Sequence, residues 1–270
     1  MFVGNSLVKE RFLATVAQDR IHAFLVLGPE HVGKTRLVHE LACIRLGRSL
    51  RPIEQDVVRL FASESGARLT LEMIHGLIAG CAQGALEPRT ISIEGADRLT
   101  PEAANALLVF LEHPPQRTVI VLTARSAESV IPTIRSRCVP FVLGPVSQDE
   151  LRAGLTSMRL GVDASLMEEA IKLSDGLPGI AVRAIQDQHY RRSLRTMAAL
   201  AAQWETAATL SRLKLAAKIA ERPGQARALL ERLSQTATVA HKPELLLALR
   251  RLNRNVQPRA VLEAYAMVSP

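Results

Sequence analysis

The amino-acid sequence predicts an α/β fold, with a parallel β-sheet first, a small helical region next and an all-helical region at the C-terminal end. Three observations favour this fold. In the first half of the chain, short apolar segments alternate with segments of helical periodicity, which is typical of a parallel sheet covered by helices on both faces. A glycine-rich phosphate-binding loop joins the first apolar segment to a helical one. After Gly144, the periodic segments are helical.

The length of the chain indicates more than one domain. A chain of 270 residues exceeds what one compact core usually contains, so two or three domains are expected. Hydrophobic residues make up 48% and charged residues 22% of the sequence, as in an ordinary globular protein. From the change of pattern along the chain we expect three parts, at residues 1–144, 145–188 and 189–270.

The predicted strands are short runs of apolar and β-branched residues. The first of them ends in glycine and has the continuous apolar character of a buried parallel strand. The last shares its segment with a short helical turn. In chain order, the strands are predicted at residues 22–28, 56–62, 90–95 and 117–124 and within 130–144.

The helices between these strands carry apolar residues at helical spacing. The one with the clearest ends covers residues 101–113, because Thr100 can cap it, Pro101 suits its first turn and two prolines follow it. Gly47 can end an earlier helix. The helices of this first part are predicted at residues 7–18, 34–47, 69–80 and 101–113.

The remaining half of the chain is predicted to be helical. Three short helices, each opened by Ser, Asp or Pro, cover residues 147–158, 163–176 and 178–188. From about residue 190 the chain is rich in Ala, Leu and Arg, with breaks near Pro223 and Pro243. We expect its leucines to be mostly core, at Leu245, Leu246, Leu247 and Leu249. A solvated face or contact with DNA phosphates is expected for its basic residues, Arg191, Arg192, Arg195, Arg212, Lys214, Lys218, Arg250, Arg251 and Arg254.

Composition limits the classes of partner. The net charge of +8 permits contact with nucleic acid, but aromatic residues make up only 3%, which argues against base stacking. The three cysteines, Cys43, Cys81 and Cys138, form no C-x-x-C pair, so neither a zinc site nor a disulfide framework is expected. The N-terminal residues lack the apolar core of a signal peptide, and no segment approaches the length of a spanning helix. The sequence therefore predicts a cytoplasmic protein without a membrane partner.

The phosphate-binding loop fits the pattern G-x-x-x-x-G-K-[ST] without a substitution. Its glycines allow successive backbone N–H groups to face a phosphate, and the following helix adds its positive N-terminal end. Lys34 is expected to bridge the β- and γ-phosphates, and Thr35 to offer its hydroxyl to Mg²⁺. The loop predicts ATP or ADP with Mg²⁺, the alternative being a simple strand–helix turn. Its residues are Gly28, Pro29, Glu30, His31, Val32, Gly33, Lys34 and Thr35.

The third predicted strand lacks one of the carboxylates that ATP hydrolysis requires. A P-loop ATPase normally ends this strand with Asp, which holds Mg²⁺ through water, and then Glu, which orients the attacking water. Here Glu94 takes the first place and can approach the metal, but Gly95 takes the second and has no side chain. Asp97 is expected to be a turn residue. The sequence therefore predicts a site that holds nucleotide without efficient hydrolysis.

Four segments give the chain a family resemblance. In sequence order they are GPEHVGKT, ADRLTPEAANALLVFLEHPP, IPTIRSRC and DGLPGIAVR. Together they resemble the AAA+ clamp-loader family of bacterial DNA polymerase III, and within it the delta-prime subunits, over about residues 1–185. The resemblance implies a P-loop AAA+ domain, a helical lid domain and a collar-like C-terminal domain. It also implies a hetero-oligomeric ring of clamp-loader subunits that opens a sliding clamp and leaves it on primed DNA.

The resemblance assigns roles to three further positions. Arg137, in Ser-Arg-Cys, corresponds to a finger that reaches the γ-phosphate held by a neighbouring subunit. Thr123 corresponds to a polar sensor beside the γ-phosphate, the alternative being a strand-end cap. The lid arginine of the family's ATPase subunits corresponds to Gly179 here, and Arg183, one helical turn later, is a candidate substitute.

These departures predict a stator, a subunit that does not hydrolyse ATP but completes the active site of its neighbour. The first alternative is a self-sufficient AAA+ ATPase, either the clamp-loader motor subunit or a helicase-type relative. A second is an interaction adaptor unrelated to replication. The sequence leaves open which nucleotide fills the loop, the stoichiometry of the ring and direct contact with DNA.

Overall fold

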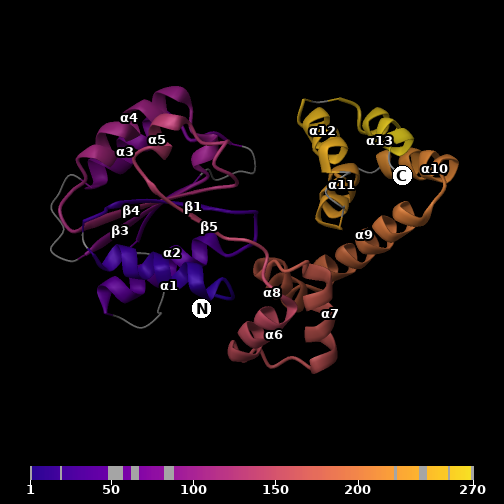
Figure 1. Ribbon diagram of the computed structural model, residues 1–270, viewed down its shortest axis with the longest axis horizontal. Coiled ribbons are helices and arrows are strands. Elements are labelled where there is room, and N and C mark those ends of the chain that lie inside the picture. The colour runs from indigo at the N-terminus through magenta and orange to yellow at the C-terminus, as the bar shows by residue number, and fades with distance from the viewer. Residues whose placement is uncertain are drawn as a thin grey trace. The chain divides into compact units, whose positions relative to one another are not determined.

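The computed structural model describes residues 2–18, 20–47, 57–61, 67–81, 88–221, 224–236, 242–254 and 256–268, with the segment 57–61 described by its backbone alone. The chain divides into two compact units, Met1–Val182 and Arg183–Pro270, drawn in Figure 1. The first unit contains the strands and the second is helical. The three-part division drawn from the sequence stays a prediction.

The first unit is built on a five-stranded parallel sheet with the strand order β2-β3-β4-β1-β5. Leu27 pairs with Ala124, and Glu94 pairs with Thr123, so the carboxyl ends of β1, β3 and β4 meet at one edge. β4 lies on one side of β1 and β5 on the other, so the strand order changes direction at β1. Ligands of open parallel sheets bind beside such a switch point. The predicted strands are confirmed as β1 (Ala23–Leu27), β2 (Val57–Phe61), β3 (Arg89–Glu94), β4 (Thr118–Ala124) and β5 (Val139–Val142).

Helices cover both faces of this sheet, as Figure 1 shows. Alternate residues of β1 point to opposite faces, so Leu25 joins one buried cluster while Phe24 and Val26 join the other. Every residue of β1 is buried, as the sequence predicted for a parallel strand. One face carries α1 (Ser6–Ala17) and α2 (Lys34–Leu46), and the other carries α3 (Leu71–Cys81), α4 (Pro101–Glu112) and α5 (Pro132–Arg135).

The ends of α4 follow the predicted signals. The hydroxyl of Thr100 accepts a hydrogen bond from the backbone N–H of Ala103 at 3.2 Å, and Pro101 occupies the first turn. His113 lies at the C-terminal cap. The helix therefore runs from the carboxyl edge of the sheet, where β3 ends, to the amino edge, where His22 Nε2 lies 2.7 Å from the carbonyl oxygen of Leu111.

Three short helices follow β5, as predicted: α6 (Gln148–Ser157), α7 (Ala164–Ser174) and α8 (Pro178–Gln186). Ser147 and Glu150 form a capping box at the start of α6, and Asp163 caps α7. Leu177 is buried in the apolar cluster that α1 and α2 form with the sheet, and this contact holds the start of α8 against the sheet. We call these three helices the lid.

The second unit packs its helices around one apolar core. Trp204 is buried there and stacks on Tyr265, with the ring centroids 6.0 Å apart. The break predicted near Pro223 falls outside the described residues, and Pro243 lies in the first turn of a helix. The helices are α9 (Gln188–Thr206), α10 (Thr209–Ala220), α11 (Gln225–Thr236), α12 (Lys242–Asn253) and α13 (Pro258–Val268).

Two expectations for this unit are wrong in part. Leu245 is buried and Leu249 packs against the core, but Leu246 and Leu247 are 53% and 49% exposed, because consecutive helical residues point to different sides. Arg212 lies on no solvated face. Only 5% of it is exposed, and its guanidinium donates to backbone carbonyls at the end of α9.

The three cysteines are buried and free. Burial raises the pKa of the Cys43 and Cys81 thiols and raises that of Cys138 to about 12. Because the thiolate is the reactive form, Cys138 at pH 8 is ionised in roughly one molecule in 10⁴. No described helix is long and apolar enough to cross a membrane.

These pKa directions predict slow thiol chemistry in the folded protein. At pH 8 we expect a disulfide reagent such as DTNB to label the native chain at least about 100-fold more slowly than the chain unfolded in guanidinium chloride. The absorbance of the released thiolate measures both rates. A thiol that reacts in the native chain as fast as in the unfolded one would contradict the expectation.

Candidate functional site

A cavity of about 360 Å³ opens at the carboxyl edge of the sheet, where the phosphate-binding loop, β3, β4 and the lid meet. Most of the predicted site residues line it, namely Glu30, His31, Gly33, Lys34, Thr35, Glu94 and Thr123. Three others, Gly28, Pro29 and Val32, belong to the loop without lining the cavity, and Arg137 lies elsewhere. Val32 is buried in the core, and the carbonyls of Gly28 and Pro29 accept hydrogen bonds from Lys34.

The loop leaves β1 through backbone conformations that favour glycine. Gly28 has φ 149°, and a Cβ there would lie 2.4 Å from the carbonyl oxygen of Leu143. His31 has φ 63°, an uncommon value for a residue with a side chain, of the kind that structures retain at ligand-binding loops. The loop then enters α2, whose N-terminal end favours an anion.

The Lys34 ammonium lies across the loop. Its Nζ donates to the carbonyl oxygens of Gly28 and Pro29, each at 2.7 Å. Burial lowers the pKa of Lys34, while the carboxylates of Glu30 and Asp97 act in the opposite direction. A phosphate bound in the cavity would favour the charged ammonium in the same way as these carboxylates.

Thr35 and Glu94, the candidate magnesium ligands, lie side by side. The Thr35 hydroxyl donates to Glu94 Oε2 at 3.0 Å, although the two residues are on different elements. A hydroxyl and a carboxylate are the hard oxygen donors that Mg²⁺ takes beside phosphate oxygens. These residues therefore fit Mg²⁺ bound with a nucleotide, with Thr35 and Glu94 at the metal and Lys34 at the phosphates. Among the described residues, no three His, Cys, Asp or Glu side chains are grouped to hold a metal ion by themselves.

A side chain at the position after Glu94 would be strained by the backbone and would require Arg98 to move. Gly95 has φ 84°, and a Cβ there would lie 2.5 Å from Nε of Arg98. Its N–H donates to the Thr123 carbonyl oxygen at 3.0 Å and lies 3.3 Å from the Thr123 hydroxyl oxygen. Thr123 thus lines the cavity and also ties β4 to β3. Asp97 lies in the single 3₁₀ turn η1 (Ala96–Arg98) that follows, as expected for a turn residue.

The lid meets the phosphate-binding loop directly. The N–H of Gly179 donates to the carbonyl oxygen of His31 at 2.8 Å, and a Cβ at Gly179 would lie 3.0 Å from that oxygen. The backbone contact leaves little room for any side chain where the ATPase subunits of the resembling family have an arginine. Within the second unit, the Arg183 guanidinium lies 4.0 Å from the ring centroid of Tyr190.

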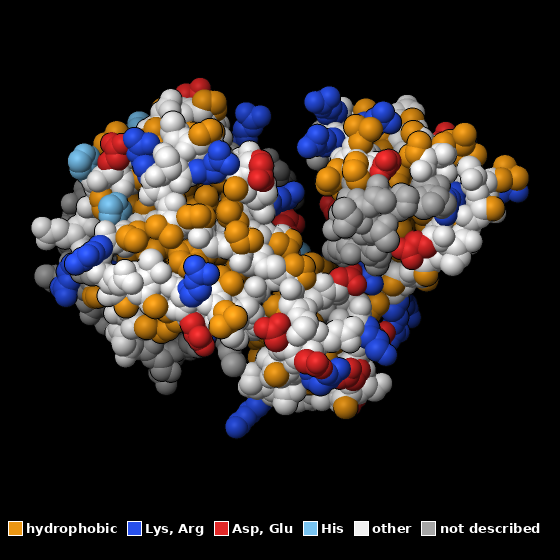
Figure 2. Space-filling view, in the orientation of Figure 1, with side chains coloured by type: hydrophobic (Ala, Val, Ile, Leu, Met, Phe, Trp, Pro, Cys, Tyr) orange, Lys and Arg blue, Asp and Glu red, His pale blue; other side chains and the backbone are white. Residues whose placement is uncertain are grey.

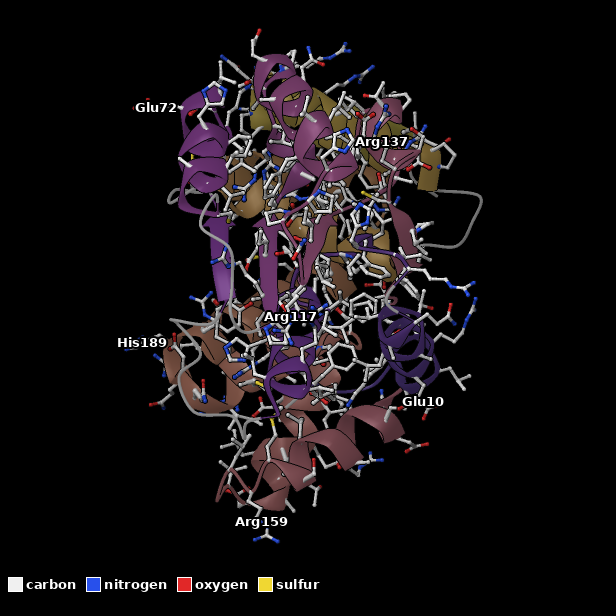
Figure 3. All side chains as sticks on the ribbon, turned by 90° about the vertical axis from the view of Figure 1, so that its left-hand side faces the viewer. Glu10, Glu72, Arg117, Arg137, Arg159 and His189 are labelled. Carbon is white, nitrogen blue, oxygen red and sulfur yellow. The ribbon has the colours of Figure 1, made fainter. Side chains whose placement is uncertain are left out.

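Arg137 lies at the opposite edge of the sheet from the cavity. It precedes β5, which starts beside Phe24 near the amino end of β1. Its Nε donates to Glu112 Oε1 at 2.7 Å, and its Nη1 donates to the Thr133 carbonyl oxygen at 3.0 Å. The four residues of β5 alone span roughly 13 Å toward the cavity edge. Figure 3 labels Arg137, whose side chain is 35% exposed.

The structure adds a residue that sequence reasoning missed. Arg125 lines the cavity and forms an ion pair with Glu30 of the phosphate-binding loop. Its position gave a usable signal, since it directly follows β4 and the carboxyl ends of neighbouring parallel strands share one edge. The contact of Gly179 with His31 had no such signal, because it depends on how the lid folds back.

Comparison with known proteins decides the family. A family model described as DNA polymerase III, delta subunit, matches residues 4–147, more than half of the chain. The chain belongs to this delta-subunit family. The predicted relation to the clamp-loader proteins of bacterial DNA polymerase III is confirmed. The matched residues contain the phosphate-binding loop, Gly95 and the Ser-Arg-Cys turn.

Curated relatives agree with this family. The delta' subunit of DNA polymerase III from Yersinia pestis is 31% identical over 47% of this chain and 38% of that protein. The delta' subunit from Pseudomonas aeruginosa is 28% identical over 60% of this chain and 55% of that protein. A replication factor C small subunit from Methanocella arvoryzae is 24% identical over 68% of this chain and 58% of that protein. The delta-family chain thus matches about half the length of these relatives.

Solved structures support the fold alone. A DNA polymerase III gamma subunit-related protein from Thermotoga maritima has a TM-score of 0.52 and 17% identity, with 95% of this chain and 98% of that chain covered. A RuvB mutant from the same organism has a TM-score of 0.55 and 15% identity, with 98% and 86% covered. The predicted AAA+ α/β fold is confirmed.

Proposed function

We propose that this delta-family chain is a non-hydrolysing stator subunit of a DNA polymerase III clamp loader in the cytoplasm. It holds ATP or ADP with Mg²⁺ in its own site and supplies Arg137 to the nucleotide of an adjoining ATPase subunit. The other clamp-loader subunits are its direct partners, and it acts on the sliding clamp and primed DNA through the complex. The observation that carries the proposal is Gly95, which has no side chain and a left-handed backbone, beside the grouped side chains of Lys34, Thr35 and Glu94.

The reasoning from Gly95 is chemical. Hydrolysis needs a group that orients water against the terminal phosphate, and a carboxylate after the magnesium ligand is the usual one. A left-handed φ opposes a side chain at this position, and the Arg98 side chain would have to move aside for one. Lys34, Thr35 and Glu94 remain grouped around the cavity, which supports binding without turnover.

The position of Arg137 supports action on a neighbour. It lies at the amino edge of the sheet, whereas the chain's own cavity lies at the carboxyl edge, so it cannot serve this cavity without refolding β5. A guanidinium is planar and presents several N–H donors in a rigid arrangement, so it can neutralise charge on a transferred phosphoryl group with two parallel hydrogen bonds. The single ammonium of lysine lacks this geometry. Its two fixed hydrogen-bond partners limit its rotamers before a neighbour arrives.

Direct DNA contact by this chain is not part of the proposal. On the face shown in Figure 2, Lys and Arg side chains are interspersed with acidic and apolar ones on each unit rather than gathered in one patch. Arg212, one of the basic residues considered for such a contact, is buried. The net charge of +8 alone assigns no DNA-binding surface to this chain.

One observation favours the alternative of a self-sufficient AAA+ ATPase. The hydrogen bond between Thr35 and Glu94 keeps a complete pair of magnesium ligands, which a binding-only site does not strictly need. The isolated chain distinguishes the two functions. We expect it to bind Mg-ATP, with affinity lowered at least about 10-fold by Lys34→Ala, because a charged contact to phosphate is lost. Calorimetry measures binding, and phosphate release measures turnover.

The turnover of the wild-type chain is expected to equal that of Lys34→Ala, since neither orients a water molecule. Gly95→Glu is the matched variant, and it should remain inactive because its backbone and Arg98 oppose a productive carboxylate. Wild-type hydrolysis well above the Lys34→Ala background would establish the ATPase alternative. Absence of nucleotide binding would remove the nucleotide part of the proposal.

A further inference from the structure

We propose that Arg125 binds the terminal phosphate of a nucleoside triphosphate in this chain's own site, and that Glu30 is its partner when that phosphate is absent. The proposal rests on the nucleotide site of the proposed function and names how that site distinguishes a triphosphate from a diphosphate. It gives Arg125 the role of a binding residue and Glu30 that of a competing anion.

The topology brings Arg125 to the phosphate-binding loop. It directly follows Ala124, the last residue of β4, and Ala124 pairs with Leu27, the last residue before the loop. Two neighbouring parallel strands therefore deliver the loop and Arg125 to the same place. Arg125 lines the cavity together with Lys34 and Thr35, the residues expected at the phosphates and the metal.

The present partner of Arg125 is easily exchanged. Arg125 Nη2 pairs with Oε1 of Glu30, and both side chains are 62% exposed. An exposed ion pair stabilises a fold little, so giving it up for a phosphate has a small penalty. A guanidinium also matches phosphate oxygens with two parallel N–H donors, which a single point charge cannot do.

Three other charged groups that line the cavity have contacts that suit different roles, and Arg36 and Asp97 line it as well. Lys34 is held by loop carbonyls, Glu94 accepts from Thr35, and the Arg98 guanidinium covers Gly95. Glu30 and Arg125 act on Lys34 in opposite directions, which indicates that both lie near its ammonium. A phosphate near Lys34 is therefore attracted by Arg125 and repelled by Glu30.

The lid contributes no positive charge at Gly179, where it contacts the phosphate-binding loop. Gly179 has no side chain, and its backbone N–H donates to the His31 carbonyl oxygen. A triphosphate has more negative charge than a diphosphate, and Lys34 is expected to bridge two of its phosphates. Arg125 is positioned to neutralise the additional charge of the terminal phosphate from the edge of the sheet rather than from the lid.

The test uses the full chain and measures Kd for Mg-ATP and for Mg-ADP by calorimetry. Arg125→Ala is expected to weaken the binding of ATP at least about 10-fold and that of ADP less than about 3-fold, since a charged hydrogen bond to one phosphate is lost. Arg125→Lys should recover part of the loss. Glu30→Gln should tighten the binding of ATP about 3-fold or more, and this gain in affinity should vanish when Arg125→Ala is also present. Arg11→Ala, an exposed arginine on α1, is the matched control and should change neither Kd.

The outcomes separate this inference from the proposed function. If the wild-type chain binds ATP and Arg125→Ala binds it equally well, the inference is wrong and the nucleotide site stands. Equal losses for ATP and ADP would also overturn it, because the terminal phosphate would not be what Arg125 contacts. If the wild-type chain binds neither nucleotide, the proposed nucleotide site fails, and this inference fails with it.

Discussion

Replacing Arg137 by alanine should lower ATP turnover at the adjoining subunit about 10³-fold, the lower end of the range for an arginine finger. The measurement is DNA-stimulated phosphate release in a ring reconstituted with the clamp-loader ATPase subunits of the same organism, the sliding clamp and primed DNA. Only the subunit that adjoins this chain should keep an intact phosphate-binding loop. The signal then comes from the one site that Arg137 is proposed to complete.

The size of this effect follows from charge and geometry. Arg137 is held by Glu112 and by the Thr133 carbonyl, so its guanidinium is ordered before it meets a phosphate. Arg137→Lys should lose most of the turnover as well, because one ammonium cannot replace the planar fork. Affinity for ATP at the adjoining site should fall much less than turnover, since the charge that Arg137 is proposed to neutralise develops during transfer.

Assembly must be measured beside turnover. Both Arg137 variants should enter the ring at wild-type stoichiometry, as judged by size-exclusion chromatography, because the side chain is partly exposed and outside the core. Arg135→Ala, two residues earlier on the same turn, is the matched control and should leave turnover unchanged. Unchanged turnover for Arg137→Ala in an assembled ring would remove the finger assignment.

The sequence predicted those features that are encoded by neighbouring residues. The strands were found from continuous apolar runs, and the ends of α4 from Thr100, Pro101 and the prolines after the helix. The phosphate-binding loop was found from its glycine spacing, and the lost carboxylate from one residue, Gly95. Each of these signals is complete within about ten residues, so no knowledge of the tertiary structure was needed.

The features that the sequence did not predict depend on contacts between distant segments. Glu30 and Arg125 are separated by 95 positions, and Gly179 meets His31 only because the lid folds onto the loop. The left-handed backbone at Gly95 and the proximity of Arg98 were likewise visible only in the structure. A pattern can therefore show that a catalytic group is missing, while a structure is needed to show what takes its place.

The break between α9 and α10 is the clearest example in the second unit. It falls at Ala207 and Ala208, two good helix formers, with neither Pro nor Gly to end the helix. Arg212 of α10 binds the carbonyl groups at the end of α9 instead. Its Nε donates to the carbonyl oxygen of Trp204 at 2.9 Å, and its Nη2 donates to that of Glu205 at 3.3 Å. These carbonyls belong to the last turn of α9, where i+4 partners run out, and that of Trp204 also accepts from the Ala207 N–H at 3.4 Å.

Arg212→Ala should therefore destabilise the second unit by about 3 kcal/mol. The change removes the guanidinium donors from the Trp204 and Glu205 carbonyls and opens a space in the core, and each effect contributes about 1–3 kcal/mol. A positive charge at a helix C-terminus is lost as well. Trp204 is the only tryptophan of the chain, so its fluorescence during urea unfolding follows this unit specifically.

Lys214→Ala is the matched control, because Lys214 is an exposed cation on the same helix and its loss should change stability by less than about 0.5 kcal/mol. Both variants keep the helix propensity of α10, since alanine is the best helix former. The difference between them therefore measures the contacts of Arg212 alone. A urea midpoint for Arg212→Ala equal to that of Lys214→Ala would mean that the turn between α9 and α10 is held by packing around Trp204 rather than by the buried guanidinium.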